Sequence, residues 1–294
     1  MMLDVRHRTH YRYQNPAVFS QHLLRLTPGA APGQRVAITH VTITPEPENL
    51  DSHTDMFGNT VHVATVSRPH ETLEIVATSR VDRATPEGMI FDTSSPWEHT
   101  KATALGLGNL SPVAELGPFA FPSQMTAGDA AIEAYTRESF SPGRPVLAAA
   151  EELTHRIFKD FAYTPGATSA DTLPVDSFAK KEGVCQDFAH VMLAGLRALR
   201  VPARYVSGYL RTQPPEGKAR LQGADASHAW VSVWDPAFGW VDFDPTNDCV
   251  PGQDHVALAH GRDYSDVSPV AGVVVGAGAQ RLTVGVDVTA AGEA

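Results

Sequence analysis

One stretch of the chain, residues 183–190, fixes where a buried helix begins. It reads Gly-Val-Cys-Gln-Asp-Phe-Ala-His, and apolar residues recur behind it at helical spacing. This spacing predicts a helix with one side against a core. Gly183 is expected to supply the unusual backbone of a sharp turn, which puts Cys185 at the helix N-terminus. The apolar positions of the helix are Phe188, Ala189, Met192, Leu196 and Leu199.

A cysteine in this position is a candidate nucleophile. Unpaired backbone N–H groups and the positive end of the helix dipole favour the thiolate, which is the reactive form. Taken alone, Cys185 reads equally well as a small buried residue that starts a core helix, since free cysteines are among the most buried residue types. The choice between these interpretations depends on the residues that the fold brings beside it.

Two alternating runs further along the chain predict a β-hairpin. The first covers residues 227–234 and the second covers residues 240–245, and the turn between them reads Asp-Pro-Ala-Phe-Gly. If Trp234 faces Trp240, every pair of opposed residues in the two strands follows from that one pairing. The period of two then decides which side chains share a face.

This register places His228 and Asp244 on the same face of the hairpin. They are diagonal neighbours, about 7–8 Å apart, and a turn shorter by two residues would put them directly opposite each other. Either arrangement gives a carboxylate that can hold an imidazole, whereas a shift by one residue would separate them. Asp242 shares the face but pairs further from His228, so it is the weaker candidate. Alone, Asp244 before a proline would be read as a turn former.

A cysteine at a helix N-terminus with a histidine and an aspartate on adjacent strands is the layout of nucleophile, base and orienting acid in acyl transfer. Three motifs carry it: Gly-Val-Cys-Gln-Asp-Phe-Ala-His, Ser-His-Ala-Trp-Val and Gly-Trp-Val-Asp-Phe-Asp-Pro-Thr. They resemble the motifs of the transglutaminase-like superfamily, and Pro-Ala-Arg-Tyr-Val-Ser-Gly-Tyr matches the strand between the first two. The resemblance puts the catalytic triad on Cys185, His228 and Asp244.

The fold class that follows is α+β. The resemblance implies a papain- or transglutaminase-like core over residues 146–250, with a helix-borne cysteine against antiparallel strands. Residues 1–83 read as an all-β domain, a sandwich or barrel, and such a domain often precedes the core in bacterial members of the family. Residues 84–145 are rich in proline and are expected to form a connector with short helices. Residues 251–294 are expected to be a loop and then a returning strand over residues 281–288.

The local patterns make these expectations more specific. Asp176 is expected to cap a short helix before Gly183, and residues 161–168 read as a loop. The Pro-Pro-Glu-Gly sequence at residues 214–217 is a candidate rim of the cleft. Strands are predicted over residues 3–13, 22–26, 35–44, 60–66 and 72–81, and helices over residues 129–139 and 146–158.

Composition excludes several partners. The chain has 23 basic and 33 acidic residues, a formal charge of −10, which disfavours nucleic acid because binding phosphates needs clustered Lys and Arg. No segment approaches the roughly 18 apolar residues of a membrane span, and the N-terminus lacks the apolar region of a signal peptide. Cys185 and Cys249 do not make a disulfide framework, and Cys249 is interpreted as incidental. These features favour a cytoplasmic enzyme with a reduced thiol.

The oxyanion of an acyl transfer needs hydrogen-bond donors. The backbone N–H of Cys185 is the expected first donor, and Tyr163 is the candidate side-chain donor. The tryptophan that animal transglutaminases use has no counterpart upstream of the cysteine, where Trp97 is the nearest and lies far outside the core. Asp187 lies in the first turn of the helix, where an acid suits the dipole, so we do not interpret it as catalytic.

Neither a metal nor a cofactor is expected. The histidines of the N-terminal domain do not fall at zinc-ligand spacing beside cysteines, and we interpret them as residues on solvated strand faces. No acidic cluster resembles a calcium loop, which counts against a true transglutaminase. The histidines concerned are His7, His10, His22, His40, His53, His62 and His70.

Three functions remain open at this stage. The favoured one is a protease or amidase that hydrolyses peptide or isopeptide-like amides through a thioester acyl-enzyme. The second is an acyltransferase that passes the acyl group to an amine, as in transglutaminase cross-linking or arylamine N-acetyltransferase chemistry. The third is an inactive scaffold that binds peptides in the same cleft, although an intact Cys, His and Asp argues against it. The expected partner is therefore a peptide or protein substrate.

Overall fold

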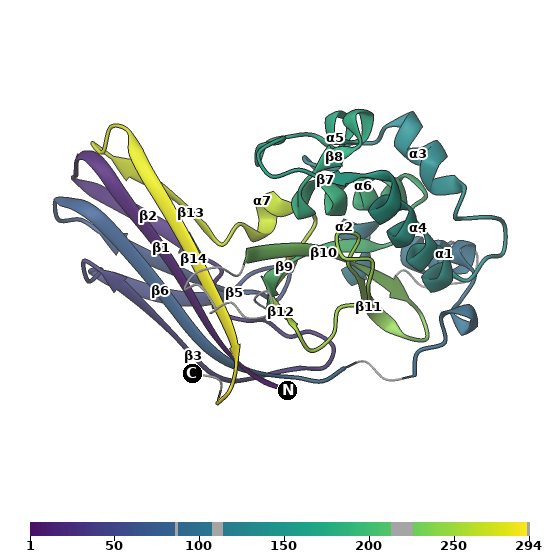
Figure 1. Cartoon of the computed structure of the whole chain (residues 1–294), viewed down its shortest axis with the longest axis horizontal. Coiled ribbons are helices and arrows are strands. Elements are labelled where there is room, and N and C mark those ends of the chain that lie inside the picture. Colours follow the sequence, from purple (N-terminus) through teal and green to yellow (C-terminus); the bar gives the residue numbers. More distant parts are fainter. Residues whose placement is uncertain (86–87, 108–113, 213–225, 293–294) are drawn as a thin grey trace, which may run out of the picture.

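The computed structural model describes residues 1–85, 88–107, 114–212 and 226–292. A β-domain lies on one side of the molecule, and a domain with the helices over a further sheet lies on the other (Figure 1). The fold is thus α+β as predicted. The candidate cleft rim at residues 214–217 lies outside the described residues.

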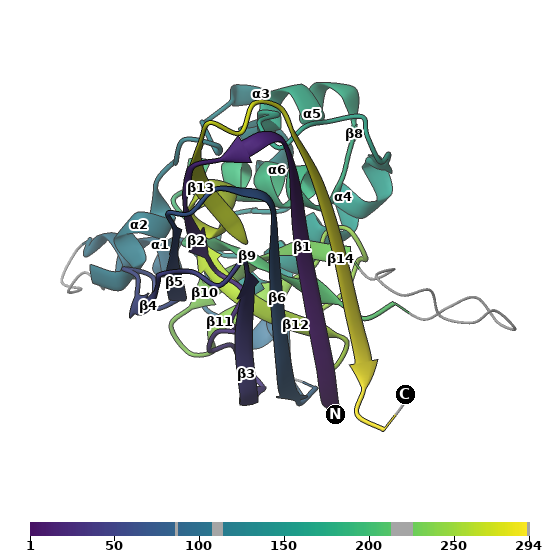
Figure 2. The same cartoon turned by 90° about the vertical axis from the view of Figure 1, so that its left-hand side faces the viewer.

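The N-terminal domain is a sandwich of two four-stranded antiparallel sheets. Their orders are β14-β1-β6-β3 and β13-β2-β5-β4, and Figure 2 shows the four strands of the first sheet side by side. Leu24 and Ala64 from one sheet share a buried cluster with Leu73 and Ile75 from the other, so the core lies between the sheets. The strands are β1 (Met2–Ala17), β2 (Phe19–Leu24), β3 (Gln34–Thr44), β4 (Asn49–Thr54), β5 (Thr60–Val66), β6 (His70–Arg83), β13 (Val270–Val275) and β14 (Gln280–Ala290).

The predicted strands of this domain are present, but the sequence missed β4 and also β13, which lies in the expected loop after residue 250. The sequence of β4, Asn-Leu-Asp-Ser-His-Thr, is exposed along its whole length, so it carries no alternating apolar signal. The run at residues 281–288 returns as predicted within β14, which pairs with β1 from Leu3↔Ala290 to Tyr13↔Gln280. The start of β1 and the end of β14 therefore lie side by side (Figure 2).

The interpretation of the N-terminal histidines as solvated was wrong for three of them. His7, His22 and His70 are 2%, 3% and 7% exposed. They alternate with exposed residues, as apolar strand positions do, and neutral imidazole can be buried when its nitrogens find partners. His7, for example, bonds Thr9 Oγ1 through Nε2 at 2.7 Å.

The connector contains short helices, as expected. Asp129 caps the third α-helix by accepting from the backbone N–H groups of Ala131 and Ile132. Trp97 is buried in the core and donates Nε1–H to the Ser141 carbonyl at 3.0 Å, so it is a structural residue. The elements are η1 (Phe91–Thr93), α1 (Trp97–Leu105), η2 (Ala114–Leu116), α2 (Gly117–Ala120) and α3 (Ala130–Arg137).

The second domain packs helices on a four-stranded sheet of order β11-β10-β9-β12. Helix α6 is its centre, because nearly every residue from Asp187 to Arg197 is buried. The elements are α4 (Val146–Asp160), β7 (Ala162–Tyr163), α5 (Pro174–Lys180), β8 (Glu182–Gly183), α6 (Cys185–Ala198), β9 (Ala203–Leu210), β10 (Ala226–Asp235), β11 (Gly239–Phe243), β12 (His255–Gly261) and α7 (Tyr264–Val267).

Three local predictions in this domain need correction. The expected loop after residue 250 contains β12, whose Val-Ala-Leu-Ala run is buried on both faces and so does not alternate. Residues 161–168 include β7, which pairs in parallel with β8. Asp176 is not a helix cap, because α5 begins at Pro174 and Asp176 lies in its first turn.

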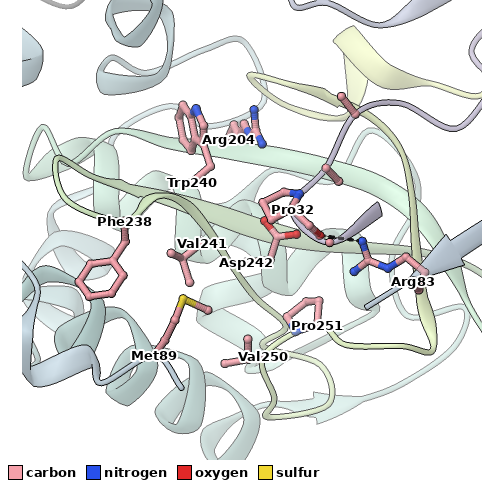
Figure 3. Close-up of a pocket in the computed structure, with 13 residues that line it drawn as sticks. Pro32, Arg83, Met89, Arg204, Phe238, Trp240, Val241, Asp242, Val250 and Pro251 are labelled. Atoms are coloured by element: carbon pink, nitrogen blue, oxygen red, sulfur yellow. Dashed lines mark hydrogen bonds between the residues drawn. The ribbon is translucent and has the colours of Figure 1, made fainter. Parts of the chain in front are cut away.

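The two domains share a continuous core. Leu3, Val5 and Val288 from the outer strands belong to the same buried cluster as helix α6. The Tyr209 hydroxyl bonds His7 Nδ1 at 2.8 Å across the boundary. Arg83, at the end of β6, bonds the carbonyls of Pro32, in its own domain, and Gly252, in the second (Figure 3). The β-domain is therefore fixed against the sheet of the second domain.

Buried neutral histidines make the free energy of unfolding depend on pH below neutrality. Burial lowers the pKa of His7, His22 and His190 to about 4, from an ordinary 6.5. The unfolded chain takes up protons first, so their contribution is complete above about pH 6.5 and is lost as the pH falls towards 4. We expect the free energy of unfolding, measured in urea, to fall over this range by up to about 1.4 kcal/mol per pH unit for each histidine.

His22→Phe should make this decline shallower, since one titrating group is removed. His53→Phe is the matched control, because His53 is exposed on β4, and it should keep the native slope. Equal slopes in all three proteins would contradict the burial argument.

Candidate active site

Cys185 is the first residue of helix α6, as predicted. The Asp187 carboxylate fastens the helix start by accepting from the backbone N–H of Val184 at 2.8 Å and from Thr168 Oγ1 at 2.6 Å. Asp187 is thus a capping residue, in line with its structural interpretation. As the first helical residue, Cys185 has a backbone N–H without an intrahelical acceptor.

Gly183 is required here for a different reason than expected. It does not adopt a positive φ. Instead, an added Cβ would lie 2.6 Å from Asp187 Oδ2 and 2.8 Å from its Cγ. Glycine therefore allows the capping carboxylate to approach the backbone that precedes Cys185.

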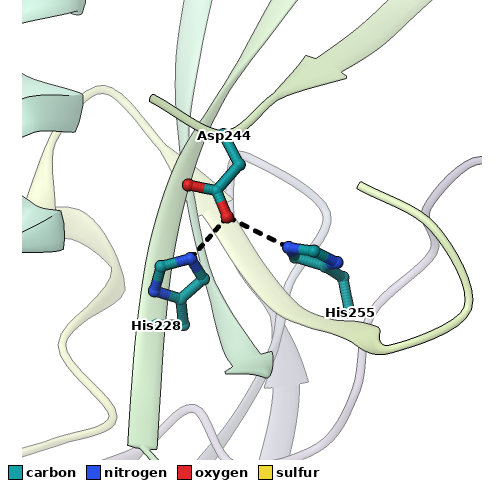
Figure 4. A group of neighbouring side chains, drawn as sticks. All are labelled: His228, Asp244 and His255. Carbon is teal, nitrogen blue, oxygen red and sulfur yellow. Dashed lines mark hydrogen bonds and ion pairs between the residues drawn. The ribbon is translucent and has the colours of Figure 1, made fainter. Parts of the chain in front are cut away.

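The hairpin has the predicted register. Trp234 pairs with Trp240, and the strands run antiparallel. His228 Nε2 then lies 2.7 Å from Asp244 Oδ2, and both side chains are buried (Figure 4). The other ring nitrogen, Nδ1, is left for the thiol.

Asp244 receives more donors than the sequence suggested. Besides His228 Nε2, its Oδ2 accepts from Asn247 Nδ2 at 2.7 Å and His255 Nε2 at 3.1 Å. Its Oδ1 accepts from the backbone N–H groups of Thr246 and Asn247. A carboxylate with this many donors stays ionised although it is fully buried.

Asn247 and His255 were missed in the sequence. Asn247 could have been predicted from turn geometry, since an aspartate commonly accepts hydrogen bonds from the backbone N–H groups two and three residues ahead. His255 had no signal, because it opens β12, the strand that was read as loop. Its ring lies 5.9 Å from that of His228, centroid to centroid.

The electrostatics favour an imidazolium at His228. Burial alone would lower its pKa, but hydrogen bonds and charge from Asp244 and Cys185 outweigh burial and raise the pKa to about 10. Burial would also raise the pKa of Asp244, and the hydrogen bonds from His228 and His255 instead hold it well below its ordinary range. The Cys185 side chain is thus adjacent to His228, and its hydrogen bond and charge are among the contributions that raise the pKa of the imidazole.

Asp242 has a separate environment. Its Oδ2 accepts from Trp230 Nε1 at 3.1 Å, and it pairs in register with Ser232 rather than reaching His228. Trp230 lies between, fully buried, with its ring 6.0 Å from that of His228. The choice of Asp244 over Asp242 agrees with this geometry.

The region around the thiol contains two tyrosines. Tyr163, the candidate oxyanion donor, pairs with Gly183 through β7 and β8 and is about half exposed. Burial and then the charge of Cys185 raise its pKa, so the two side chains are near each other. Tyr205 on β9, which the sequence did not single out, is buried. Burial, and after it the charge of Cys185, raises the pKa of Tyr205 well above 10.

His228, Asp244 and His255 also form the one cluster of potential metal ligands found among the described residues, with their ligand atoms within 4.8 Å of one another. The Asn247 Nδ2 amide lies 2.7 Å from Asp244 Oδ2 and 3.2 Å from His228 Nε2. A donor amide thus faces the atoms that an ion would need. The hydrogen bonds account for each of these atoms without an ion.

Cys249 contributes through its backbone. Its carbonyl accepts from the Asp244 N–H at 2.8 Å, and the two residues form an isolated β-bridge. Burial, together with the charges of Asp244 and Asp248, raises the pKa of the Cys249 thiol to about 12. Both cysteines are free, and Cys249 is unsuited to act as a nucleophile at neutral pH.

Comparison with known proteins identifies the family. The bacterial transglutaminase-like N-terminal region matches residues 3–82, and the transglutaminase-like superfamily matches residues 133–245. An uncharacterized protein of Mycobacterium tuberculosis (strain H37Rv) is 38% identical over 277 residues, which are 92% of this chain and 86% of that protein. One of Mycobacterium leprae is 32% identical and covers 98% of both chains. The chain belongs to the transglutaminase-like superfamily, whose members are generally cysteine enzymes.

Two further relatives bear on structure and activity. The crystal structure of a candidate cysteine protease from Cytophaga hutchinsonii matches with a TM-score of 0.73 and 21% identity, over 99% of this chain and 91% of that one, which shows a common fold. A protein-glutamine gamma-glutamyltransferase of Pseudomonas aeruginosa is 37% identical over 113 residues, 37% of this chain but 16% of that protein. Within the described ranges, no helix has the length and apolar character needed to cross a membrane.

Gly183→Ala tests the start of helix α6. We expect it to lower the free energy of unfolding by about 1–3 kcal/mol, because the new Cβ collides with the Asp187 carboxylate. Gly128→Ala is the matched control, since nothing lies within 4 Å of a Cβ there. Urea denaturation of both variants measures the effect, and similar stabilities would contradict the close contact.

Asp244→Asn tests the charge that holds His228. Removing the carboxylate should lower the pKa of His228, so the alkaline inflection in the rate of Cys185 alkylation, expected near pH 10 in the native chain, should move down by about one unit or more. The control is Asp248→Asn, whose carboxylate bonds the exposed His155 instead. An inflection at the same pH in both variants would rule out the proposed role of Asp244.

Proposed function

We propose that this protein is a thiol enzyme that acts on amide bonds of peptides or proteins through a thioester acyl-enzyme, with water as the usual acceptor. The single observation that carries the proposal is the position of His228, which bonds Asp244 Oδ2 through Nε2 at 2.7 Å and has Cys185 as its other partner. A scaffold that only bound peptides would not need this pairing. A reducing compartment, such as the cytoplasm, would keep the thiol in its active state.

The reaction follows from the geometry in two stages. The Cys185 thiolate attacks the carbonyl carbon, and the Cys185 N–H at the helix N-terminus donates to the oxyanion, with Tyr163 as the proposed second donor. His228 gives its Nδ1 proton to the departing amine, which leaves a thioester on Cys185. The neutral imidazole then takes a proton from the incoming water, and the water oxygen attacks the thioester carbonyl carbon. The C–S bond breaks, which releases the carboxylic acid and restores the Cys185 thiolate.

Asp244 acts through His228 during both stages. Its Oδ2 accepts a hydrogen bond from the Nε2–H group of His228. This bond fixes the tautomer and keeps Nδ1 turned to the thiol. The donors from Asn247 and His255 hold the carboxylate in place. His255 is therefore a positioning residue in this scheme.

A second candidate function is acyl transfer to an amine. This function is favoured by the similarity to the Pseudomonas aeruginosa protein-glutamine gamma-glutamyltransferase, which extends over about one third of the chain. The triad would do the same work, with His228 deprotonating the attacking amine instead of water. The two functions differ only in the acceptor that reaches the thioester.

Alkylation with iodoacetamide at pH 7 tests the thiolate directly, and Cys249 is an internal control because its pKa is raised to about 12. We expect Cys185 to react at least ~100 times faster than Cys249. His228→Ala should slow Cys185 by ~10-fold or more and leave Cys249 unchanged. If both cysteines alkylate at similar rates, the site holds no activated thiol and the proposal fails.

Product analysis separates hydrolysis from transfer. A mixture of casein peptides is incubated with the native chain, with and without monodansylcadaverine, and Cys185→Ala is the inactive control. New carboxyl ends detected by mass spectrometry indicate hydrolysis, and dansyl-labelled peptides indicate transfer. We expect mainly hydrolysis even with the amine present. Predominant labelling would replace the first candidate with the second.

A further inference from the structure

A pocket lies between the β-domain and the sheet that carries His228. It has a volume of about 530 Å3, within the range of pockets for small molecules, and Figure 3 shows its lining. One wall is apolar, and three charged side chains face the same space: Arg83, Arg204 and Asp242. The apolar wall includes Met89, Phe238, Trp240, Val241, Val250 and Pro251.

Strand pairing explains how two of these charges meet. Ser232 on β10 pairs with Arg204 on β9 and with Asp242 on β11, so the three residues form a row across one face of the sheet. His228 and Trp230 occupy the same face of β10. The row therefore lies beyond Trp230, on the side away from His228, and outside the proposed reaction.

Each of four polar side chains in this region has one buried atom without a hydrogen-bond partner in the part of the chain that the structure describes. Among the described residues, no hydrogen bond reaches the buried atoms Arg83 Nε, Arg204 Nε, Ser232 Oγ and Asp242 Oδ1. Arg83 is 2% exposed and Arg204 is 8% exposed. Buried polar groups in native proteins are nearly always hydrogen-bonded, and leaving one unpaired costs about 1–3 kcal/mol. Three of these atoms belong to residues that line the pocket, Arg83, Arg204 and Asp242, which indicates a site built for an occupant.

The two guanidinium groups are already held in position. Arg83 donates to the carbonyls of Pro32 at 2.9 Å and Gly252 at 3.2 Å, which leaves its Nε–H free. Arg204 lies over the Trp240 ring, with its Cζ 4.4 Å from the ring centroid. An occupant would thus meet preorganised donors, and little side-chain entropy would be lost on binding.

The charges in the pocket are unbalanced. Arg83, Arg204 and Asp242 are the charged side chains among the described residues that line the pocket. Two guanidinium groups against one carboxylate leave a single positive charge in surplus. A buried charge without a counterion is costly, so the missing component carries one negative charge.

We propose that this pocket binds a small organic carboxylate with an apolar body. The carboxylate would lie beside the guanidinium groups that line the pocket, and the apolar body would lie along Met89, Phe238 and Val250. Guanidinium groups suit planar carboxylates, a single negative charge matches the surplus better than phosphate does, and the apolar wall favours an organic ligand over a free inorganic ion. The inference does not depend on the proposed amide chemistry.

The test uses hexanoate and the full native chain, with isothermal titration calorimetry at constant ionic strength. We expect a Kd of about 1 mM, the range for a well-placed ligand of this size. Acetate lacks the apolar body and should bind at least ~10-fold more weakly, and hexylamine, which has the opposite charge, should not bind. Inorganic phosphate should bind more weakly than hexanoate.

Two variants of the row should act in opposite directions. Arg204→Met removes the surplus charge, so it should weaken hexanoate binding at least ~10-fold. Asp242→Asn removes the competing carboxylate, so it should tighten binding several-fold. Arg35→Met is the matched control, because Arg35 is an exposed arginine of the β-domain, and it should bind like the native chain.

Several results would overturn the proposal. One is an absence of binding to the native chain at 20 mM, a concentration about twentyfold above the expected Kd. Another is equal binding of hexanoate, acetate and hexylamine, and a third is unchanged binding in Arg204→Met. Glu87 lies outside the described residues, two positions before Met89. If Glu87→Gln bound hexanoate and the native chain did not, the counterion would belong to the chain itself.

Discussion

The second domain of this protein depends on one buried anion. The Asp244 carboxylate lies at the end of β11 and accepts hydrogen bonds from His228 on β10 and His255 on β12. An ion in that position is tolerated only if every lone pair finds a donor. The two histidine-bearing strands must therefore be in correct register before the charge can be buried. The interaction that raises the pKa of His228 also selects how this sheet assembles.

The sequence predicted this centre because the constraints on it are local. The alternation of two short runs and the length of the turn between them determine which residues oppose each other, and the pairing of Trp234 with Trp240 follows. The start of helix α6 was predictable for a similar reason, since a glycine, a capping acid and apolar periodicity all fall within a few residues.

What the sequence did not show depends on contacts between distant segments. Strand β12 is buried on both faces, so its apolar run had no period of two to distinguish it, and His255 was lost with it. The row formed by Arg204, Ser232 and Asp242 needs the pairing of β9 with β10, which no turn length fixes. His7 was misread for a related reason, because its partners are Thr9 and a tyrosine from the other domain.

The pairing of β1 with β14 has a consequence for synthesis of the chain. The first strand of the β-domain lies between β6 and β14, and β14 leaves the ribosome after every other strand of that sheet. Until it emerges, β1 has an open edge, and such edges invite pairing with other chains. The second domain is complete earlier, since its last element, α7, ends at Val267. Strand β1 is therefore made before the whole second domain, but its sheet can close only after that domain is complete, which reverses the usual order of folding during translation.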